Sequence, residues 1–233
     1  MFSNIKAVIF DLDGTLYDFR GLPFRLVKTL PRDLFLIRAD RQIRRQLKGC
    51  DFESPQAYQN EYAKQMHQQT GIKPEDVLQW YTKHYIRAMC FLLKRYYSHR
   101  PQLPEVFAKL HEKGIKIVVF SDYPQVRQRI RALGFSDDTL ATISGVYSAE
   151  DFGSQKPAPR PFLEIAKNLA VKPENCLMVG DRDDTDGAGA RATGMNFIQI
   201  QTHKTRVIEA NHPLWTWEDF AQWVLDGMEP LEK

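Results

Sequence analysis

The sequence of 233 residues contains few cysteines and no long apolar run. Its three cysteines, Cys50, Cys90 and Cys176, are odd in number and far apart. This excludes a disulfide framework and a paired-cysteine zinc site, and it favours a reducing compartment. The apolar stretch near the N-terminus, Ala7 to Phe10, is too short for a signal peptide or a membrane span. We therefore expect a cytoplasmic protein that makes no membrane contact.

The sequence also lacks a large net charge, because 32 Lys and Arg nearly balance 29 Asp and Glu and leave +3. Such a small excess does not by itself indicate a nucleic-acid-binding protein. The positive charge is, however, concentrated in one segment. Residues 18–100 carry 16 basic and 8 acidic side chains, a net charge of +8, so the remainder carries −5. With 43% hydrophobic and 26% charged residues, the composition is that of a globular protein.

Short β-branched runs alternate with helical periods in residues 1–16 and about 101–200. Strands are predicted at Ile5–Phe10, Ile115–Phe120, Cys176–Val179 and Phe197–Ile200, with a weaker one near Thr142–Tyr147. Helices are predicted over 104–114, 125–133 and 161–170, with a short closing helix that Thr216 caps and that carries an aromatic stripe. The alternation predicts an α/β fold, a doubly wound, Rossmann-like parallel sheet with helices on both faces. Its ligand site is expected at the carboxyl ends of the strands.

Residues 18–100 contain no comparable strand runs, and their apolar residues recur at helical spacing. Three helices are predicted, from Leu34 to Leu47, around Tyr58 and Tyr62 after Ser54-Pro55, and from Pro74 to Leu93. We therefore expect an inserted helical domain at 18–100 and a Rossmann-like core formed by 1–17 and 101–233. Two short hinges are expected, near residues 17–21 and 98–103.

Polar side chains follow directly after the predicted strands. Asp11 and Asp13 follow the first strand, and Ser121 follows the second. The third strand is followed by four acids, Asp181, Asp183, Asp184 and Asp186. Lys156 precedes a proline in the loop between these strands. Two ionised carboxylates this close repel each other unless a cation or a shared proton relieves them. A single such pair is more often a turn or a helix cap, but the whole set predicts a metal or catalytic site.

The order and spacing of these residues resemble the haloacid dehalogenase superfamily. The four motifs of that family correspond to Asp11-Leu12-Asp13-Gly14-Thr15, Ser121, Lys156-Pro157 and Gly180-Asp181 with Asp186. The helical insert corresponds in position to the family's cap domain inserted after the first motif. The resemblance implies a Mg²⁺-dependent phosphatase, a phosphoric monoester hydrolase that acts on a small phosphorylated metabolite. The cap sequence matches no subgroup, so the identity of the substrate does not follow.

The resemblance implies that Asp11 is the nucleophile and forms an aspartyl-phosphate. A carboxylate needs no deprotonation at neutral pH, and the intermediate splits one displacement into two easier ones. Mg²⁺ relieves the repulsion between this carboxylate and the phosphate. Its expected ligands are Asp11, Asp181 and the main-chain carbonyl of Asp13. Asp186 is expected one layer further out, where it holds a metal-bound water or orients Lys156.

The resemblance also implies that Asp13 is the general acid and base, which calls for a somewhat raised pKa. The family's dehalogenases have no acid at this position, so Asp13 favours phosphoryl chemistry. Lys156 is a further catalytic residue and, together with Ser121, is expected to bind the transferring phosphoryl oxygens. Arg182 either touches the substrate or pairs with a neighbouring acid.

The basic segment offers arginines for an anionic substrate. Any one of them is more often part of a solvated helix face, but at least one is expected to reach the site. The candidates are Arg20, Arg25, Arg41, Arg44 and Arg45.

Other functions remain open at this point. A phosphomutase would use the same four motifs. A non-catalytic receiver-like phosphate-binding module shares the acid cluster, hydroxyl and lysine, although such modules are shorter and have no helical insert. Nucleic-acid binding by the basic segment would be weak and steeply salt-dependent, and no aromatic platform supports it. We expect a monomer or homodimer whose partner is a small phosphorylated substrate and not a nucleic acid.

Overall fold

The computed structural model describes residues 4–203, 205–207 and 212–229, so the predicted core ranges 1–17 and 101–233 include residues outside it. Its centre is one six-stranded sheet in the order β3-β2-β1-β4-β5-β6, with every neighbouring pair parallel. The strands are β1 (Ala7–Phe10), β2 (Lys116–Ser121), β3 (Ile143–Ser148), β4 (Cys176–Gly180), β5 (Asn196–Ile200) and β6 (Leu214–Trp215). Five lie where the sequence predicts strands. The edge strand β6 was not predicted, because two residues carry no periodicity.

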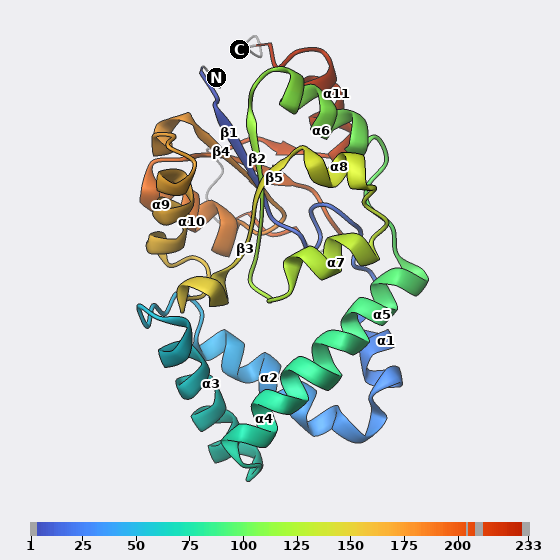
Figure 1. Ribbon diagram of the computed structural model, residues 1–233, viewed down its shortest axis with the longest axis vertical. Helices are drawn as coiled ribbons and strands as arrows, with labels where there is room; N and C mark the ends of the chain where they lie inside the picture. Colours follow the sequence, from blue (N-terminus) through green and yellow to red (C-terminus); the bar gives the residue numbers. More distant parts are fainter. Residues whose placement is uncertain (1–3, 204, 208–211, 230–233) are drawn as a thin grey trace.

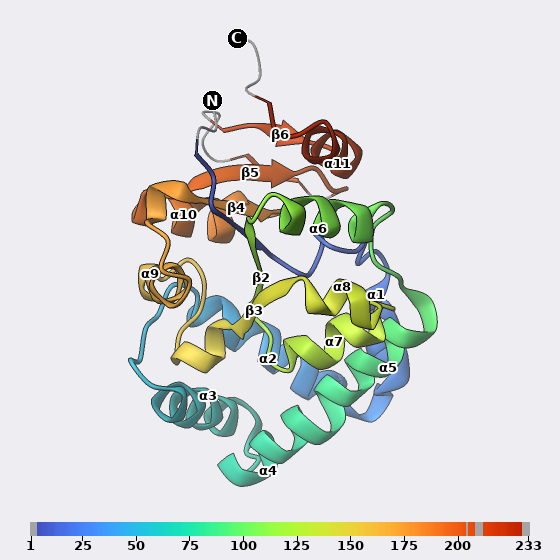
Figure 2. The ribbon, with the colours of Figure 1, turned by 45° about the horizontal axis from the view of Figure 1, so that its top comes forward.

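Helices cover both faces of the sheet (Figure 2). Along β1, Val8 and Phe10 point to one hydrophobic core, and Ala7 and Ile9 point to the other. The first core is covered by α6 (Leu103–Glu112), α7 (Val126–Ala132) and α11 (Trp217–Leu225), with α8 (Asp137–Ala141) beside α6. The second is covered by α9 (Pro159–Asn168) and α10 (Ala188–Thr193). The predicted fold class, a doubly wound α/β sheet, is therefore confirmed.

The chain between β1 and α6 is helical and lies at the end of the molecule away from both termini (Figure 1). Its elements are α1 (Leu22–Thr29), η1 (Pro31–Asp33), α2 (Leu34–Gln46), α3 (Pro55–Thr70), α4 (Pro74–Trp80), η2 (Tyr81–Tyr85) and α5 (Ile86–Tyr96). The last three form one continuous helix with a π-helical turn in it, as the prediction of a single helix implies. Helix α1 was not predicted. Helix α3 begins at the predicted Ser54-Pro55, where Ser54 Oγ accepts a hydrogen bond from the Ala57 amide.

This helical region touches the core at a point that is distant from both chain connections. The Phe52 amide donates to the Gly153 carbonyl at 2.9 Å, and the Gln155 amide donates to the Cys50 carbonyl at 3.0 Å. Gly153 has a φ of 68°, and a Cβ there would collide with the backbone of Ser54. The close approach therefore requires glycine, and it fixes the region over the carboxyl ends of the strands.

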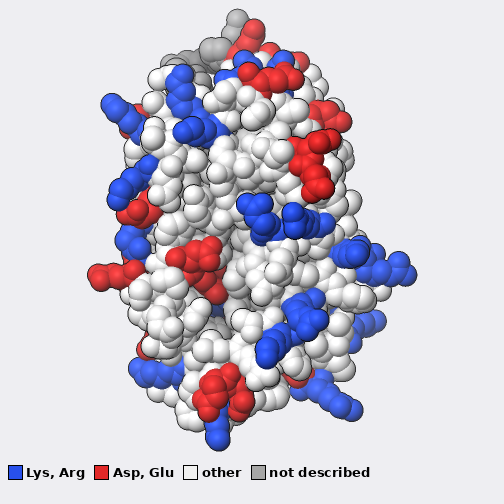
Figure 3. All heavy atoms as spheres, in the orientation of Figure 1, with Lys and Arg blue, Asp and Glu red and all other residues white. Residues whose placement is uncertain are grey.

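The surface reflects the uneven charge of the sequence. On the face shown in Figure 3, Lys and Arg gather over α5 and α7. In the described ranges, no helix has both the length and the apolar composition that a bilayer span requires.

Candidate active site

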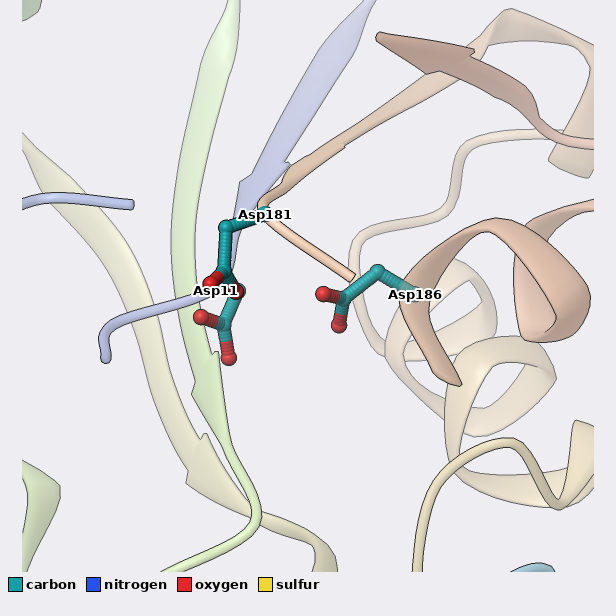
Figure 4. A group of neighbouring side chains, drawn as sticks. All are labelled: Asp11, Asp181 and Asp186. Carbon is teal, nitrogen blue, oxygen red and sulfur yellow. The ribbon is translucent and has the colours of Figure 1, made fainter. Parts of the chain in front are cut away.

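Three predicted carboxylates meet at the carboxyl edge of the sheet. Asp11 directly follows β1, Asp181 directly follows the neighbouring strand β4, and Asp186 lies in the π-helical turn η5 (Asp183–Gly187). One oxygen from each lies within 4.8 Å of the others, and the three carboxylates face one another in Figure 4. All three residues are buried. The parallel register of β1 and β4 thus brings together residues that are 170 positions apart in the sequence.

Lys156 provides the positive charge at the centre of this group. Its Nζ donates to Asp11 Oδ1 at 2.8 Å, to Asp186 Oδ1 at 2.8 Å and to the carbonyl of Phe120 at 2.9 Å. Burial alone would lower the pKa of Lys156, but Asp11 and Asp186 outweigh it and raise the pKa. The lysine is therefore an ammonium ion in direct contact with Asp186. That Asp186 orients Lys156 stays a prediction.

The three carboxylates carry more negative charge than Lys156 neutralises. Burial, with further contributions from Asp186 and Asp13, raises the pKa of Asp11 to about 7 despite the opposing effect of Lys156. Burial and the neighbouring charges of Asp11 and Asp186 raise the pKa of Asp181 well above its usual range. Ionised carboxylates in this arrangement repel one another unless a cation lies between them.

A divalent cation fits these residues. Within the described ranges, Asp181 Oδ1 is buried and has no hydrogen-bond partner, which is unusual for a carboxylate oxygen. Gly14, with a φ of +99°, lies directly against the same carboxylate, and a Cβ at this position would fill the space beside it. Small hard cations such as Mg²⁺ prefer carboxylate and carbonyl oxygens. Asp11 and Asp181 therefore meet the requirements of the predicted metal ligands.

Asp13 lies in an environment different from the one expected. Its carboxylate forms a salt bridge with Arg129 through both oxygens and accepts a hydrogen bond from the Tyr17 hydroxyl. Burial raises the pKa of Asp13, but the charge and hydrogen bonds of Arg129, with those of Tyr17 and Ser121, lower it overall. The sequence analysis predicted a raised pKa for Asp13. The prediction was wrong because it did not include Arg129.

Ser121 contacts both Asp13 and Arg129. Its Oγ donates to Asp13 Oδ2 at 3.2 Å and accepts from Arg129 Nη1 at 2.9 Å and from the Tyr123 amide at 3.2 Å. Ser121 therefore lies at the predicted edge of the sheet, but its hydroxyl is engaged with Asp13. Arg129 is fully buried. Its position on the apolar stripe of α7, next to Ile130, is a sequence signal that could have drawn attention to it.

Arg182 follows the second of its two predicted alternatives. It donates to Asp184 from Nε at 3.0 Å and from Nη2 at 2.7 Å. Lys48, from the helical region, contacts the same carboxylate. The neighbouring Asp183 instead pairs with Arg191 at 2.7 Å. The acids that follow β4 are thus divided between the buried cluster (Asp181 and Asp186), a buried carboxylate paired with Arg191, and a partly exposed carboxylate paired with Arg182 and Lys48.

Two cavities with opposite charge open onto this edge. One, of about 240 Å³, lies against α1 and the π-helical turn η2; we call it the acidic cavity, and its charged lining residues are Asp11, Asp13, Asp122, Asp181, Asp186 and Arg182. The other, of about 250 Å³, lies against α2; we call it the basic cavity, and its charged lining residues are Arg41, Arg44, Arg45, Lys48, Lys156, Arg182 and Asp122.

Three of the five candidate arginines, those on α2, therefore line a cavity that also contains Lys156. The other two contact different groups. Arg20 pairs with Asp18 at 2.6 Å, and the guanidinium of Arg25 lies over the ring of Tyr96.

Comparison with known proteins agrees with this geometry. Residues 5–194 match the family model described as haloacid dehalogenase-like hydrolase. A glyceraldehyde 3-phosphate phosphatase from Methanopyrus kandleri is 25% identical over 226 residues, covering 88% of each chain. A phosphoglycolate phosphatase from Aquifex aeolicus is 26% identical over 193 residues, covering 81% of each chain. The crystal structure of a HAD phosphatase from Thermococcus onnurineus has the same fold, with a TM-score of 0.61 at 22% identity over 97% of this chain and 100% of its own.

Proposed function

The chain belongs to the haloacid dehalogenase-like hydrolases, and on that premise we propose that it is a Mg²⁺-dependent phosphatase acting on a small phosphorylated metabolite. The observation that carries the proposal is the buried group of Asp11, Asp181 and Asp186 around Lys156. It combines a candidate nucleophile, oxygen ligands for a divalent cation and an ammonium ion for the phosphoryl oxygens. The phosphatases named among its relatives support the same reaction.

In this proposal Asp11 attacks the phosphorus atom and becomes an aspartyl-phosphate, which water then hydrolyses. Lys156 holds one oxygen of Asp11 by a hydrogen bond of 2.8 Å and orients the nucleophile. The Thr15 hydroxyl donates to the other oxygen, Asp11 Oδ2, at 3.2 Å. Bound by Asp11, Asp181 and the main-chain carbonyl of Asp13, Mg²⁺ would supply the positive charge that the phosphoryl group and the two carboxylates together require.

Asp13 is proposed to move the proton. Paired with Arg129 it is a carboxylate, which suits the second step, where it draws a proton from the attacking water. To protonate the leaving group in the first step, Asp13 first has to take up a proton from solvent, which requires its side chain to turn away from Arg129. That proton passes to the leaving oxygen, and the proton later drawn from the attacking water replaces it. The same movement of the side chain would release Ser121 to bind a phosphoryl oxygen, since the hydroxyl now donates to Asp13.

Residues 18–100 are proposed to form a cap domain over the site, with Asp186 orienting Lys156 from beyond the metal. A cytoplasmic location and a monomeric or homodimeric state also stay predictions.

Phosphate release from an aryl phosphate in the presence of Mg²⁺ tests the proposal. We expect Asp11→Asn to lower kcat by more than about 10³-fold, because the amide is a poor nucleophile. Asp138→Asn, an exposed acid on α8, is the matched control and should retain full activity. Full activity of Asp11→Asn, or activity that survives excess EDTA, would contradict the proposal. Conversion of a sugar phosphate into its isomer without phosphate release would instead identify a phosphomutase.

A further inference from the structure

The two cavities share four residues, Asp122, Tyr123, Arg182 and Thr185, and therefore adjoin each other. The acidic cavity contains the nucleophile and the proposed metal ligands, so it is the place of the reacting phosphoryl group. The basic cavity adjoins it and contains no proposed catalytic group except Lys156. A substrate whose phosphoryl group lies in the acidic cavity has room to extend into the basic one.

Most cations of the basic cavity already have a carboxylate partner. Lys48 and Arg182 share Asp184, and Arg44 pairs with Asp40 at 2.9 Å and with Glu150 at 2.7 Å. The exceptions are two arginines one helical turn apart on α2. In the described part of the chain, neither Arg41 nor Arg45 forms an ion pair. Residues four apart on a helix lie on the same side of it, so the two guanidinium groups can reach one ligand.

Arg44 adds an independent observation. This residue is only 8% exposed, yet among the described residues its Nη1 is buried without a hydrogen-bond partner. Buried donors are nearly always paired in native structures, and Arg44 lines the basic cavity, so its guanidinium has hydrogen-bonding capacity left beside Arg41 and Arg45. An anion between Arg41 and Arg45 would bring acceptor oxygens to this wall of the cavity.

We propose that the substrate carries a second anionic group, a carboxylate or a second phosphate, which binds in the basic cavity to Arg41 and Arg45. The inference rests on the proposed phosphatase function and specifies its substrate class. Planar guanidinium groups suit both anions because they donate two parallel hydrogen bonds to adjacent oxygens. The alternative occupant is an apolar leaving group held in the acidic cavity by Leu22, Leu26 and Met89. The unpaired guanidinium groups favour the anion.

The experiment compares kcat/KM for compounds that share an alkyl phosphate and differ in the second group. Ethyl phosphate has none, 2-phosphoglycolate has a carboxylate, and propane-1,3-diol bisphosphate has a second phosphate. Each is measured with the wild-type protein, with Arg41→Met and Arg45→Met, and with Arg38→Met as the matched control. Arg38 is an exposed residue of the same helix that lines neither cavity, so its removal changes net charge equally.

We expect wild-type protein to prefer one doubly anionic compound over ethyl phosphate, and the preferred compound identifies the second group as carboxylate or phosphate. Arg41→Met and Arg45→Met should each lower this preference by roughly ten- to a hundredfold, the value of a charge-assisted hydrogen bond. Arg38→Met should leave the preference within about twofold.

Two results would overturn the inference while leaving the phosphatase intact. One is hydrolysis of all three compounds with a preference that neither arginine variant changes. The other is a preference for phenyl phosphate over both doubly anionic compounds. It would place the leaving group against Leu22, Leu26 and Met89 of the acidic cavity. Absence of phosphate release from every compound, aryl phosphate included, would instead reject the proposed function itself.

Discussion

The acidic and basic cavities adjoin at one edge of the sheet, but they are built in different ways. The acids of the first come from loops that follow the neighbouring strands β1, β2 and β4, so the order of parallel strands brings them together. Three of the four arginines of the second, Arg41, Arg44 and Arg45, come from one helix, α2, and reach the site only because the helical region packs on the core. On the proposed function, the reaction therefore belongs to the sheet and recognition of the substrate to the helices.

The two cavities also differ in how their charges are balanced. In the acidic cavity, like charges are held together and the pKa values of Asp11 and Asp181 rise, so folding without a cation carries an electrostatic cost. In the basic cavity, Arg44 is compensated by buried carboxylates from both regions, and Arg182 by a partly exposed one. Repulsion therefore destabilises the acidic cavity, whereas in the basic cavity carboxylates compensate the charges of Arg44 and Arg182.

The largest expected effect on stability concerns the ion pairs of Arg44 in the basic cavity. Arg44→Met leaves Asp40 and Glu150 buried without their cation, so we expect the free energy of unfolding to fall by about 3–5 kcal/mol. Denaturant unfolding followed by circular dichroism measures it. Arg45→Met, an exposed neighbour, is the control and should cost less than about 0.5 kcal/mol. Equal stability of the two variants would show that Arg44 does not join the helical region to the core.

A second prediction concerns the acidic cavity and how the stability of the metal-free protein depends on pH. The pKa of Asp11 is about 7 when folded and near 3.8 when unfolded, so the folded state binds more protons between these values. The stability of the metal-free protein should therefore fall as pH rises from 5 to 8, by roughly 2–3 kcal/mol. Asp181→Asn removes a second carboxyl group with a raised pKa and should make this fall smaller.

Thermal unfolding in EDTA at pH 5 and pH 8 measures the difference, because other titrating groups cancel between wild type and Asp181→Asn. Added Mg²⁺ should restore stability to the wild-type protein at pH 8 by binding the folded state, and should do less for the variant. The same pH dependence in both proteins would show that Asp181 does not contribute to the repulsion.

The same contrast explains which parts were predictable from the sequence. Runs such as Ala7–Phe10 gave the strands, and acids at strand ends gave the site, because a parallel sheet aligns its carboxyl ends. Asp11 and Asp181 were predicted to lie together on this basis, and Lys156 was added to them from the loop between the strands. Helix α1 and the two-residue strand β6 were missed, since short elements depend on tertiary packing more than on periodicity.

Side-chain partners were not predictable in the same way. Arg129 is eight residues from Ser121 along the chain and 116 residues from Asp13, and only the packing of α7 on the sheet joins them. Without that contact, the expected pKa shift of Asp13 had the wrong direction. Arg44 and Glu150, 106 residues apart, are a similar case. Strand order determines where a residue lies, whereas its charge state depends on neighbours from other elements.

The smallest expected effect concerns Asp184, which accepts hydrogen bonds from Arg182 and contacts Lys48 at the border of the basic cavity. The three side chains are 32%, 52% and 36% exposed, respectively, so their ion pairs should contribute less than about 1 kcal/mol to stability. Asp184→Asn leaves both cations uncompensated beside the cavity. If the cavity binds a second anionic group, kcat/KM for the preferred doubly anionic compound should rise by roughly two- to fivefold at low salt. Because added salt screens exposed charges, the gain should disappear at high ionic strength.

Asp51→Asn is the control, because it breaks a comparably exposed pair with Arg160 outside both cavities. It should cost similar stability without this gain in kcat/KM. A loss of activity in Asp184→Asn would instead mean that Asp184 holds Arg182 in position for the substrate, and the division between a catalytic sheet and a recognising helical region would no longer hold at this residue.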